Sequence, residues 1–185
     1  MEILIISGKS ASGKDTFANI MREKMENVGC KCLTIHFADL VKYYLKQYYN
    51  WDGIKDEHGR TMLQHLGTDR VRASFPDYWS ETVAKFLASI SDDFDCAFIP
   101  DARFENEIEI VKKYNPQAIS IRIERYNDDH TPYLNPTLTE EQHKHPSETS
   151  LDDYKDFDFF VHNIGDIENL NFAADIVLSH TNLLR

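Results

Sequence analysis

The chain has 185 residues, of which 42% are hydrophobic and 28% are charged, and its formal net charge is −11. This length favours one domain with one core. The negative charge disfavours a duplex nucleic acid as partner, because binding one requires a basic face that displaces counterions. No apolar run approaches the roughly 20 residues of a membrane span, and the N-terminus does not resemble a signal peptide. Three cysteines, an odd number, predict reduced thiols in a cytoplasmic protein.

The N-terminal segment predicts a strand, a glycine-rich loop and a helix. Residues 2–7 form a continuous apolar run, which is typical of a strand covered on both faces. Beyond the loop, apolar residues at helical spacing predict a helix that ends at Gly29. Residues 32–37 then predict a second strand, and a second helix begins near Asp39.

The middle of the chain, residues 50–78, has a mixed pattern. It predicts a short helix over residues 60–66 that stops at Gly67, followed by another helix. A clearer helical pattern covers residues 79–90, where the apolar positions share one face.

The second half alternates strands and helices. Strands are predicted over residues 96–101, 118–124 and 157–163, and helices over 106–114 and 167–184. Residues 125–146 hold three prolines and many polar residues, which predicts a long mobile loop. The alternation indicates one α/β domain over residues 1–185, with a mostly parallel five-stranded sheet and helices on both faces.

The loop after the first strand fits the phosphate-binding pattern G-x-x-x-x-G-K. Gly8 and Gly13 let the backbone turn its N–H groups inward around an anion, the helix start adds positive dipole, and Lys14 reaches the terminal phosphates. The preceding strand and the following helix disfavour a chance glycine-rich turn. The predicted ATP-binding residues of this loop are Gly8, Ser10, Ala11, Ser12, Gly13, Lys14, Asp15 and Thr16.

Asp15 follows the lysine where the pattern usually has Ser or Thr, and the hydroxyl comes one residue later, at Thr16. One residue along a helix is a rotation of about 100°, so Thr16 cannot simply replace the missing hydroxyl. A carboxylate is a good ligand for Mg²⁺, and beside a triphosphate it would repel the nucleotide without a cation. We expect Asp15 to face Mg²⁺ and Thr16 to touch a phosphate nearer the base. The alternative is that Asp15 only caps the helix.

Asp101 ends a strand that we expect beside the first, at the edge where α/β sheets bind ligands. It is therefore a candidate for a second acid near Mg²⁺, and a helix N-cap is the alternative. A hydrolytic ATPase often has a second carboxylate directly after this position. Its absence here favours transfer to an acceptor over hydrolysis.

Several segments together resemble one family. The loop GKSASGKDT, with Asp after the lysine, resembles that of the phage and bacterial deoxynucleoside monophosphate kinases, and a related variant occurs in animal-type phosphomevalonate kinases. FADLVK, LGTDRVR…YW, DARFENE and HPSE agree with this family in the same order. The resemblance implies a three-layer P-loop kinase fold with a mobile lid at about residues 125–146. It also implies transfer of the γ-phosphate of ATP to a deoxynucleoside monophosphate, with Mg²⁺ as cofactor.

The resemblance implies roles for individual arginines. Arg103, in the D-x-R of such kinases, would contact the acceptor phosphate, a task that suits a planar guanidinium. A lid arginine would stabilise the transferring phosphoryl group, and Arg125 is preferred over Arg122 for this role. The resulting catalytic set is Lys14, Asp101, Arg103 and Arg125. A surface position is the alternative for Arg103.

The acceptor side is implied in the same way. Asp39, Lys42 and Arg70 would border the acceptor, with Arg70 preferred over Arg72. A plain N-cap is the alternative for Asp39, and ordinary surface charge is the alternative for the arginines. Asn163, after the last strand, would bind the base of the donor or would be a turn residue. The family pattern assigns His143, His145, Ser147 and Glu148 to lid closure or acceptor contact, without a specific role for any of them.

Two other functions stay open. The chain could phosphorylate another phosphorylated small molecule, such as phosphomevalonate, or it could be a non-catalytic nucleotide-binding regulator. The expected partners are ATP and the acceptor, without nucleic acid or membrane, and homodimerisation stays open.

Overall fold

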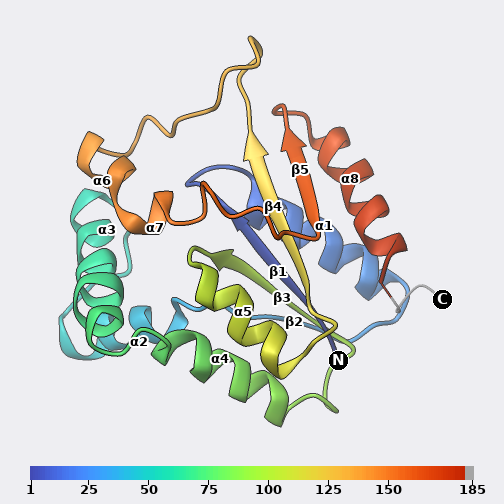
Figure 1. Ribbon diagram of the computed structural model, residues 1–185, viewed down its shortest axis with the longest axis horizontal. Coiled ribbons are helices and arrows are strands. Elements are labelled where there is room, and N and C mark those ends of the chain that lie inside the picture. Colours follow the sequence, from blue (N-terminus) through green and yellow to red (C-terminus); the bar gives the residue numbers. More distant parts are fainter. Residues whose placement is uncertain (182–185) are drawn as a thin grey trace.

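The computed structural model describes residues 1–181 and contains a five-stranded sheet between layers of helices (Figure 1). The strands are β1 Glu2–Gly8, β2 Cys32–Thr34, β3 Cys96–Ala102, β4 Ile119–Arg125 and β5 Phe159–Asn163. Their order in the sheet is β2-β3-β1-β4-β5, and every pairing is parallel. The predicted five-stranded parallel sheet is therefore confirmed.

Helices connect the strands and continue beyond the last one. In the described residues they are α1 Lys14–Asn27, α2 Asp39–Tyr48, α3 Glu57–Gln64, η1 His65–Arg72, α4 Tyr78–Ser89, α5 Glu105–Tyr114, α6 Glu140–Lys144, α7 Pro146–Thr149 and α8 Ile167–Ser179. The segment η1 is a π-helix that continues directly from α3. The last predicted helix, 167–184, ends at Ser179, and residues 182–184 of that prediction lie outside the described part. None of the described helices is long and apolar enough to cross a bilayer.

The apolar run of β1 is continuous because both of its faces are covered. Leu4 and Ile6 pack with α1 and α8, whereas Ile3 and Ile5 pack with α4 and α5 on the other side of the sheet. Successive side chains of a strand point to opposite faces, so an alternating pattern would have left one face polar. Figure 1 shows these helix pairs on the two sides of the sheet. This arrangement confirms the predicted three layers.

A smaller apolar cluster supports the segments that follow β2. Val41 and Leu45 of α2 pack against Trp51, Leu66 and Trp79. The predicted second strand over residues 32–37 ends earlier, at Thr34, and the Phe37 and Ala38 N–H groups donate to the Asp101 side chain and not to the backbone of β3.

The prediction that Gly67 stops a helix is wrong, because α3 and η1 continue through it. The indole N–H of Trp79 donates to the Gly67 carbonyl at 2.9 Å. A Cβ on Gly67 would lie 3.5 Å from Val41, an ordinary van der Waals contact, so η1 passes close to α2 at this position. Here tertiary contacts override the weak helix propensity of glycine.

The prediction of an irregular loop over residues 125–146 is wrong at α6. Thr139 and Gln142 form a capping box, in which the Thr139 hydroxyl accepts from the Gln142 N–H and the Gln142 side chain accepts from the Thr139 N–H, both at 3.2 Å. This reciprocal pair starts a short helix. In Figure 1 the segment leaves β4, passes over the top of the sheet and brings α6 beside α3, where Gln142 bonds to the Glu57 carbonyl.

Candidate active site

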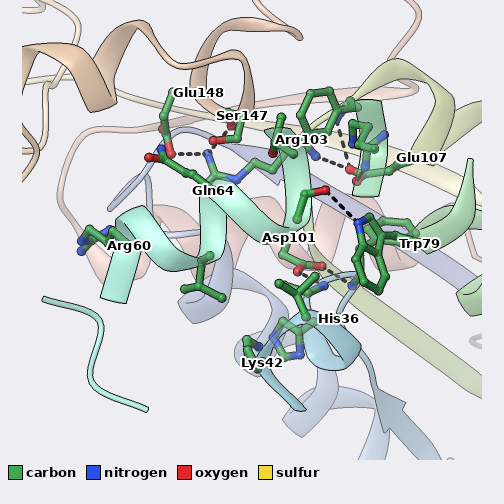
Figure 2. A pocket seen from close by; sticks show the side chains of 18 of the residues that line it. His36, Lys42, Arg60, Gln64, Trp79, Asp101, Arg103, Glu107, Ser147 and Glu148 are labelled. Carbon is green, nitrogen blue, oxygen red and sulfur yellow. Dashed lines mark hydrogen bonds and ion pairs between the residues drawn. The ribbon is translucent and has the colours of Figure 1, made fainter. Parts of the chain in front are cut away.

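A pocket of about 240 Å³ opens beside the loop between β1 and α1 (Figure 2). It is bounded by the ends of β2 and β3, by α3 and η1, and by α7. Five of the predicted site residues line it together: Lys14, Asp15, Lys42, Asp101 and Arg103. These five residues therefore bring three cations and two carboxylates into one pocket.

The loop between β1 and α1 has the backbone shape that a phosphate nest requires. Gly13 has a φ of +96°, and a Cβ on it would lie 2.5 Å from the side-chain nitrogen of Asn163. A Cβ on Gly8 would lie 2.7 Å from the Ile123 carbonyl oxygen. Side chains are thus excluded at both positions, which explains the two glycines of the motif.

Lys14 is almost completely buried at the start of α1, with 5% of its surface exposed. Its ammonium group donates to the Lys9 carbonyl at 3.3 Å. Desolvation by burial, together with the nearby Arg103 guanidinium, lowers the pKa of Lys14 to about 8. A buried ammonium that lacks an anionic partner in hydrogen-bond contact favours the binding of an external anion.

Both predicted Mg²⁺ residues line the pocket, and neither caps a helix. No side chain in the described part caps the start of α1, so the capping alternative for Asp15 is wrong. Asp101 accepts hydrogen bonds from the Phe37 and Ala38 N–H groups at 2.9 and 3.1 Å. The N-cap of α5 is Phe104, so the capping alternative for Asp101 is also wrong. Thr16 is exposed and lies outside the pocket lining.

The two carboxylates fit a site for Mg²⁺. The described residues contain no cluster of three or more His, Cys, Asp or Glu side chains that could hold a metal ion by themselves. Mg²⁺ usually binds one or two protein carboxylates and completes its octahedron with water and substrate phosphates. Asp15, which faces the pocket, and Asp101, which is fixed by two backbone amides, match that requirement.

Two cations that line the pocket were missed by the sequence analysis. Lys55 precedes α3 and Arg60 lies within it, and both side chains line the pocket. Within residues 1–181 neither of them forms a side-chain hydrogen bond or an ion pair. Burial and the nearby Lys42 lower the pKa of Lys55. These residues lie in the mixed segment 50–78, where no motif marks them.

Arg72 lines the pocket and Arg70 does not, contrary to the expected preference for Arg70. Arg70 is exposed at the surface of η1, so its position does not support contact with the acceptor. The pocket face of α3 and η1 is a row of residues four apart, Arg60, Gln64, Thr68 and Arg72. In an α-helix such a row drifts around the axis, but the wider turns of a π-helix compensate for that drift.

Arg72 is held in a fixed position by the start of α5. Its guanidinium forms an ion pair with Glu107 and lies 3.8 Å above the Phe104 ring. Glu107 also accepts from the N–H groups of Arg103 and Phe104 at 2.6 and 3.1 Å. Burial raises the pKa of Glu107, and the Arg72 charge opposes this rise. The pair thereby fixes the backbone from which Arg103 extends.

Asp39 lies outside the pocket lining, but it contacts a residue that is part of that lining. It is the first residue of α2, not its N-cap, which is Ala38. Its carboxylate accepts from the His36 N–H and from the Lys42 ammonium, both at 2.9 Å. Burial works against the ionisation of Asp39, but the hydrogen bonds from His36 and Lys42 outweigh it and hold its pKa well below the usual range. Asp39 thus orients Lys42, which lines the pocket.

Asn163 and Arg125 hold the phosphate loop from outside the pocket lining. The Asn163 amide donates to the Ser12 carbonyl at 2.8 Å, and its side-chain oxygen accepts from the Gly165 N–H at 2.9 Å. Both polar ends of Asn163 are therefore engaged within the protein, an arrangement that does not support contact with the donor base. Arg125 donates to the Ala11 carbonyl at 3.0 Å, and its role toward a phosphoryl group stays a prediction.

The HPSE segment contributes Ser147 and Glu148 to the pocket. Arg103 donates to the Ser147 carbonyl at 3.2 Å and forms an ion pair with Glu148 at 2.9 Å. His145 caps α7, because its ring accepts from the Ser147 N–H at 3.1 Å. This bond gives the histidine a local structural role.

Comparisons with known proteins agree with this architecture. The model of the family described as deoxynucleotide monophosphate kinase matches residues 53–173. A search of curated proteins gave no match. The APS kinase CysC of Mycobacterium tuberculosis, solved in complex with AMPPNP and APS, is 12% identical at a TM-score of 0.53, and the match covers 99% of this chain and 96% of that one. A sugar kinase from Janibacter sp. HTCC2649 is 12% identical at a TM-score of 0.55, with 96% and 94% covered.

The structural neighbours show the fold, and the family match shows the kind of enzyme. The match includes α3, η1, the DARFENE segment and the HPSE segment. The expected fold and the expected phosphotransferase class are both confirmed. The chain belongs to the deoxynucleotide monophosphate kinase family.

Proposed function

We propose that this kinase transfers the γ-phosphate of ATP to a deoxynucleoside monophosphate, giving the diphosphate and ADP. One observation carries the proposal. Four cationic side chains line the same pocket, namely Lys14, Arg103, Arg60 and Lys55, and this positive charge supports the binding of two phosphate groups there. The last two of these cations have no ion pair among residues 1–181.

The donor would bind at the loop between β1 and α1. Backbone N–H groups and Lys14 would hold its phosphates. Mg²⁺, held by Asp15 and by Asp101 directly or through water, would neutralise charge on the terminal phosphates. A structural neighbour was solved with the ATP analogue AMPPNP, which supports a nucleotide in this fold. Similarity of fold alone does not assign the acceptor.

The acceptor would bind along α3 and η1. Arg103 and Arg60 are suited to its phosphate, since a guanidinium group binds two phosphate oxygens at once, and the Lys55 ammonium group adds a positive point charge. The rest of the nucleotide would extend along Gln64 and Thr68, whose polar side chains are available for base or sugar contacts. Trp79, Phe104 and Val41 supply apolar lining on the same side.

The reaction needs little chemistry from side chains. An oxygen of the acceptor phosphate attacks the γ-phosphorus in line, and its new bond forms as the bond to the β–γ bridging oxygen breaks. ADP leaves with the electrons of that bond. The acceptor phosphate is already ionised at neutral pH, so no strong general base is required. The protein supplies positioning and positive charge.

A coupled assay of ADP release tests this function. The acceptor panel consists of the ribo- and deoxynucleoside monophosphates and phosphomevalonate, each with ATP and Mg²⁺. We expect rapid ADP release with at least one deoxynucleoside monophosphate and only slow release without an acceptor. Turnover with phosphomevalonate alone would reassign the acceptor. Binding of ATP without transfer to any compound would contradict the kinase proposal.

A further inference from the structure

A carboxylate occupies part of the proposed phosphate site. One Glu148 side-chain oxygen accepts a hydrogen bond of 2.8 Å from the Ser10 N–H in the phosphate loop. Its other oxygen lies 2.9 Å from an Arg103 nitrogen. Only 10% of the Glu148 side chain is exposed. Figure 2 shows Glu148 and Arg103 joined at the edge of the pocket.

The groups around Glu148 are those that a phosphate would use. A loop N–H and a guanidinium bind carboxylate and phosphate oxygens with similar geometry. Lys14 is also within electrostatic reach, because Glu148 raises its pKa while Arg103 lowers it. A phosphate bound to the same donors would lie beside the negatively charged Glu148 carboxylate, in a site that is only partly open to solvent. Repulsion between such charges is strong where water does not screen it.

The segment that carries Glu148 contacts the phosphate loop at a second point. Asp152 pairs with Lys9 of the loop at 2.8 Å and with the buried Arg122 at 3.2 Å. Glu148 itself lies on α7, a helix of only four residues. Asp152 can therefore keep the segment near the loop while Glu148 moves, because Asp152 has partners of its own.

We propose that Glu148 is an internal competitor for the phosphate site. Its carboxylate holds the Ser10 amide and Arg103 until substrate phosphates replace it on both. Arg103 then becomes available to the acceptor only when Glu148 has left, which would couple the filling of the donor site to that of the acceptor site. The identity of the acceptor in this inference rests on the proposed function, but the competition at the phosphate loop does not.

Removal of the charge from Glu148 separates competition from a purely structural role. The variant Glu148→Gln keeps a side-chain oxygen that can accept from the Ser10 N–H, but it no longer repels a phosphate. The matched control is Glu140→Gln, which removes the same charge from an exposed position in α6, where Lys144 is its one ion-pair partner among the described residues. Isothermal titration calorimetry with AMPPNP and Mg²⁺ measures the affinity of each variant.

We expect Glu148→Gln to bind AMPPNP more tightly than the wild type, on the order of tenfold, the effect of one close charge interaction. Glu140→Gln is expected to bind like the wild type. Weaker or unchanged binding in Glu148→Gln would overturn the inference, because it would mean that the carboxylate shapes the loop or has no effect on it. Circular dichroism verifies the fold of each variant. If Glu148→Gln does not fold, Glu148→Ser, which is also neutral, is used for the same test.

The same titrations distinguish this inference from the proposed function. If no monophosphate is phosphorylated in the coupled assay but Glu148→Gln binds AMPPNP more tightly, the proposed function fails and the competition stands. If a deoxynucleoside monophosphate is phosphorylated but the affinities of Glu148→Gln and wild type agree, the proposed function stands and the competition fails.

Discussion

The side-chain amide of Asn163, at the end of β5, donates a hydrogen bond of 2.8 Å to the carbonyl oxygen of Ser12 in the phosphate loop. Both residues are buried. The contact requires Gly13, because a Cβ there would lie 2.5 Å from the amide nitrogen. A strand at the edge of the sheet thus fixes the backbone that is proposed to bind ATP.

Replacement of Asn163 by Ala leaves the Ser12 carbonyl and the Gly165 N–H without this partner. We expect the free energy of unfolding to fall by about 1–3 kcal/mol, the cost of unsatisfied buried polar groups, and the KM for ATP to rise. Urea denaturation and the coupled assay measure these effects. The control Asn171→Ala removes an amide that donates to the Ile167 carbonyl within α8. A KM for ATP equal to that of the wild type would show that Asn163 does not shape the loop.

The lowered pKa of Lys14 predicts that nucleotide binding takes up a proton at alkaline pH. In the free protein the ammonium loses its proton near pH 8, whereas its ordinary pKa is 10.5. Bound phosphates favour the charged form and raise this pKa. Above pH 8 the affinity for AMPPNP should therefore fall, and up to one proton should be taken up on binding.

Calorimetry in two buffers with different ionisation enthalpies, at about pH 8.5, measures this proton uptake. Lys14→Arg is the control, since a guanidinium does not titrate in this range. Folding stability and nucleotide affinity depend on pH in opposite directions through this group. Between pH 8 and the ordinary lysine pKa the unfolded chain binds more protons, so this group makes the free energy of unfolding rise with pH. Equal proton uptake in wild type and Lys14→Arg would contradict the assignment.

The buried ion pair between Arg72 and Glu107 makes a prediction about stability. Side-chain exposures of 11% and 4% leave little water to screen either charge. Arg72→Met leaves Glu107 without its counter-charge and should lower the free energy of unfolding by about 3 kcal/mol. Adding Glu107→Gln removes the unpaired charge and should restore part of that loss, so the two effects are not additive.

Urea denaturation of the single and double variants measures this coupling. Lys85→Met is a suitable control, because it breaks an exposed pair with Glu81 and should lower the free energy of unfolding far less than Arg72→Met does. Additive losses in the Arg72 and Glu107 variants would mean that the two charges act independently.

The fold was largely predictable because its main signals are local. The continuous apolar run of β1 and the glycine loop before Lys14 each indicate their structure within a few residues. The cap of α6 is also local, since Thr139 and Gln142 have capping-box spacing, but its position among prolines favoured an irregular loop. The π-helix was not predictable, because a glycine is usually a helix stop and the Trp79 indole that bonds to the Gly67 carbonyl lies 12 residues farther along the chain.

The candidate site was predictable where a motif marked it. Lys14, Asp15 and Asp101 lie next to strand ends, and the structure brings them into one pocket. Arg60 lies in a segment without a motif. The contact between Glu148 and Ser10 joins residues that are 138 positions apart. No local pattern reports such a distant pair, and the choice between neighbouring arginines of η1 depends on a helix geometry that the sequence does not reveal.

Arg60 and Lys55 should act on the acceptor and leave the donor unaffected. We expect Arg60→Ala to raise the KM for the monophosphate by roughly tenfold to a hundredfold, the loss of a charge-assisted hydrogen bond, with little change in the KM for ATP. Lys55→Ala should have a smaller effect of the same kind. The coupled assay with each substrate varied in turn measures both constants. Arg70→Ala is the matched control, because Arg70 is exposed outside the pocket lining. A larger effect in Arg70→Ala than in Arg60→Ala would restore the original preference for Arg70.

Asp15 provides a test of the metal site that can be made with whichever acceptor the coupled assay identifies. Its carboxylate lines the pocket and is not used to cap α1. Asp15→Asn keeps the size of the side chain but weakens a hard-oxygen ligand. The Mg²⁺ concentration for half-maximal activity should therefore rise several-fold, and excess Mg²⁺ should restore part of the rate. Asp56→Asn serves as the control, because its carboxylate caps α3 through the Gly59 N–H at 2.7 Å. A ligand that loses its charge binds Mg²⁺ less tightly. An unchanged Mg²⁺ requirement in Asp15→Asn would therefore exclude contact between Asp15 and the metal, and would leave Asp101 as the proposed carboxylate ligand.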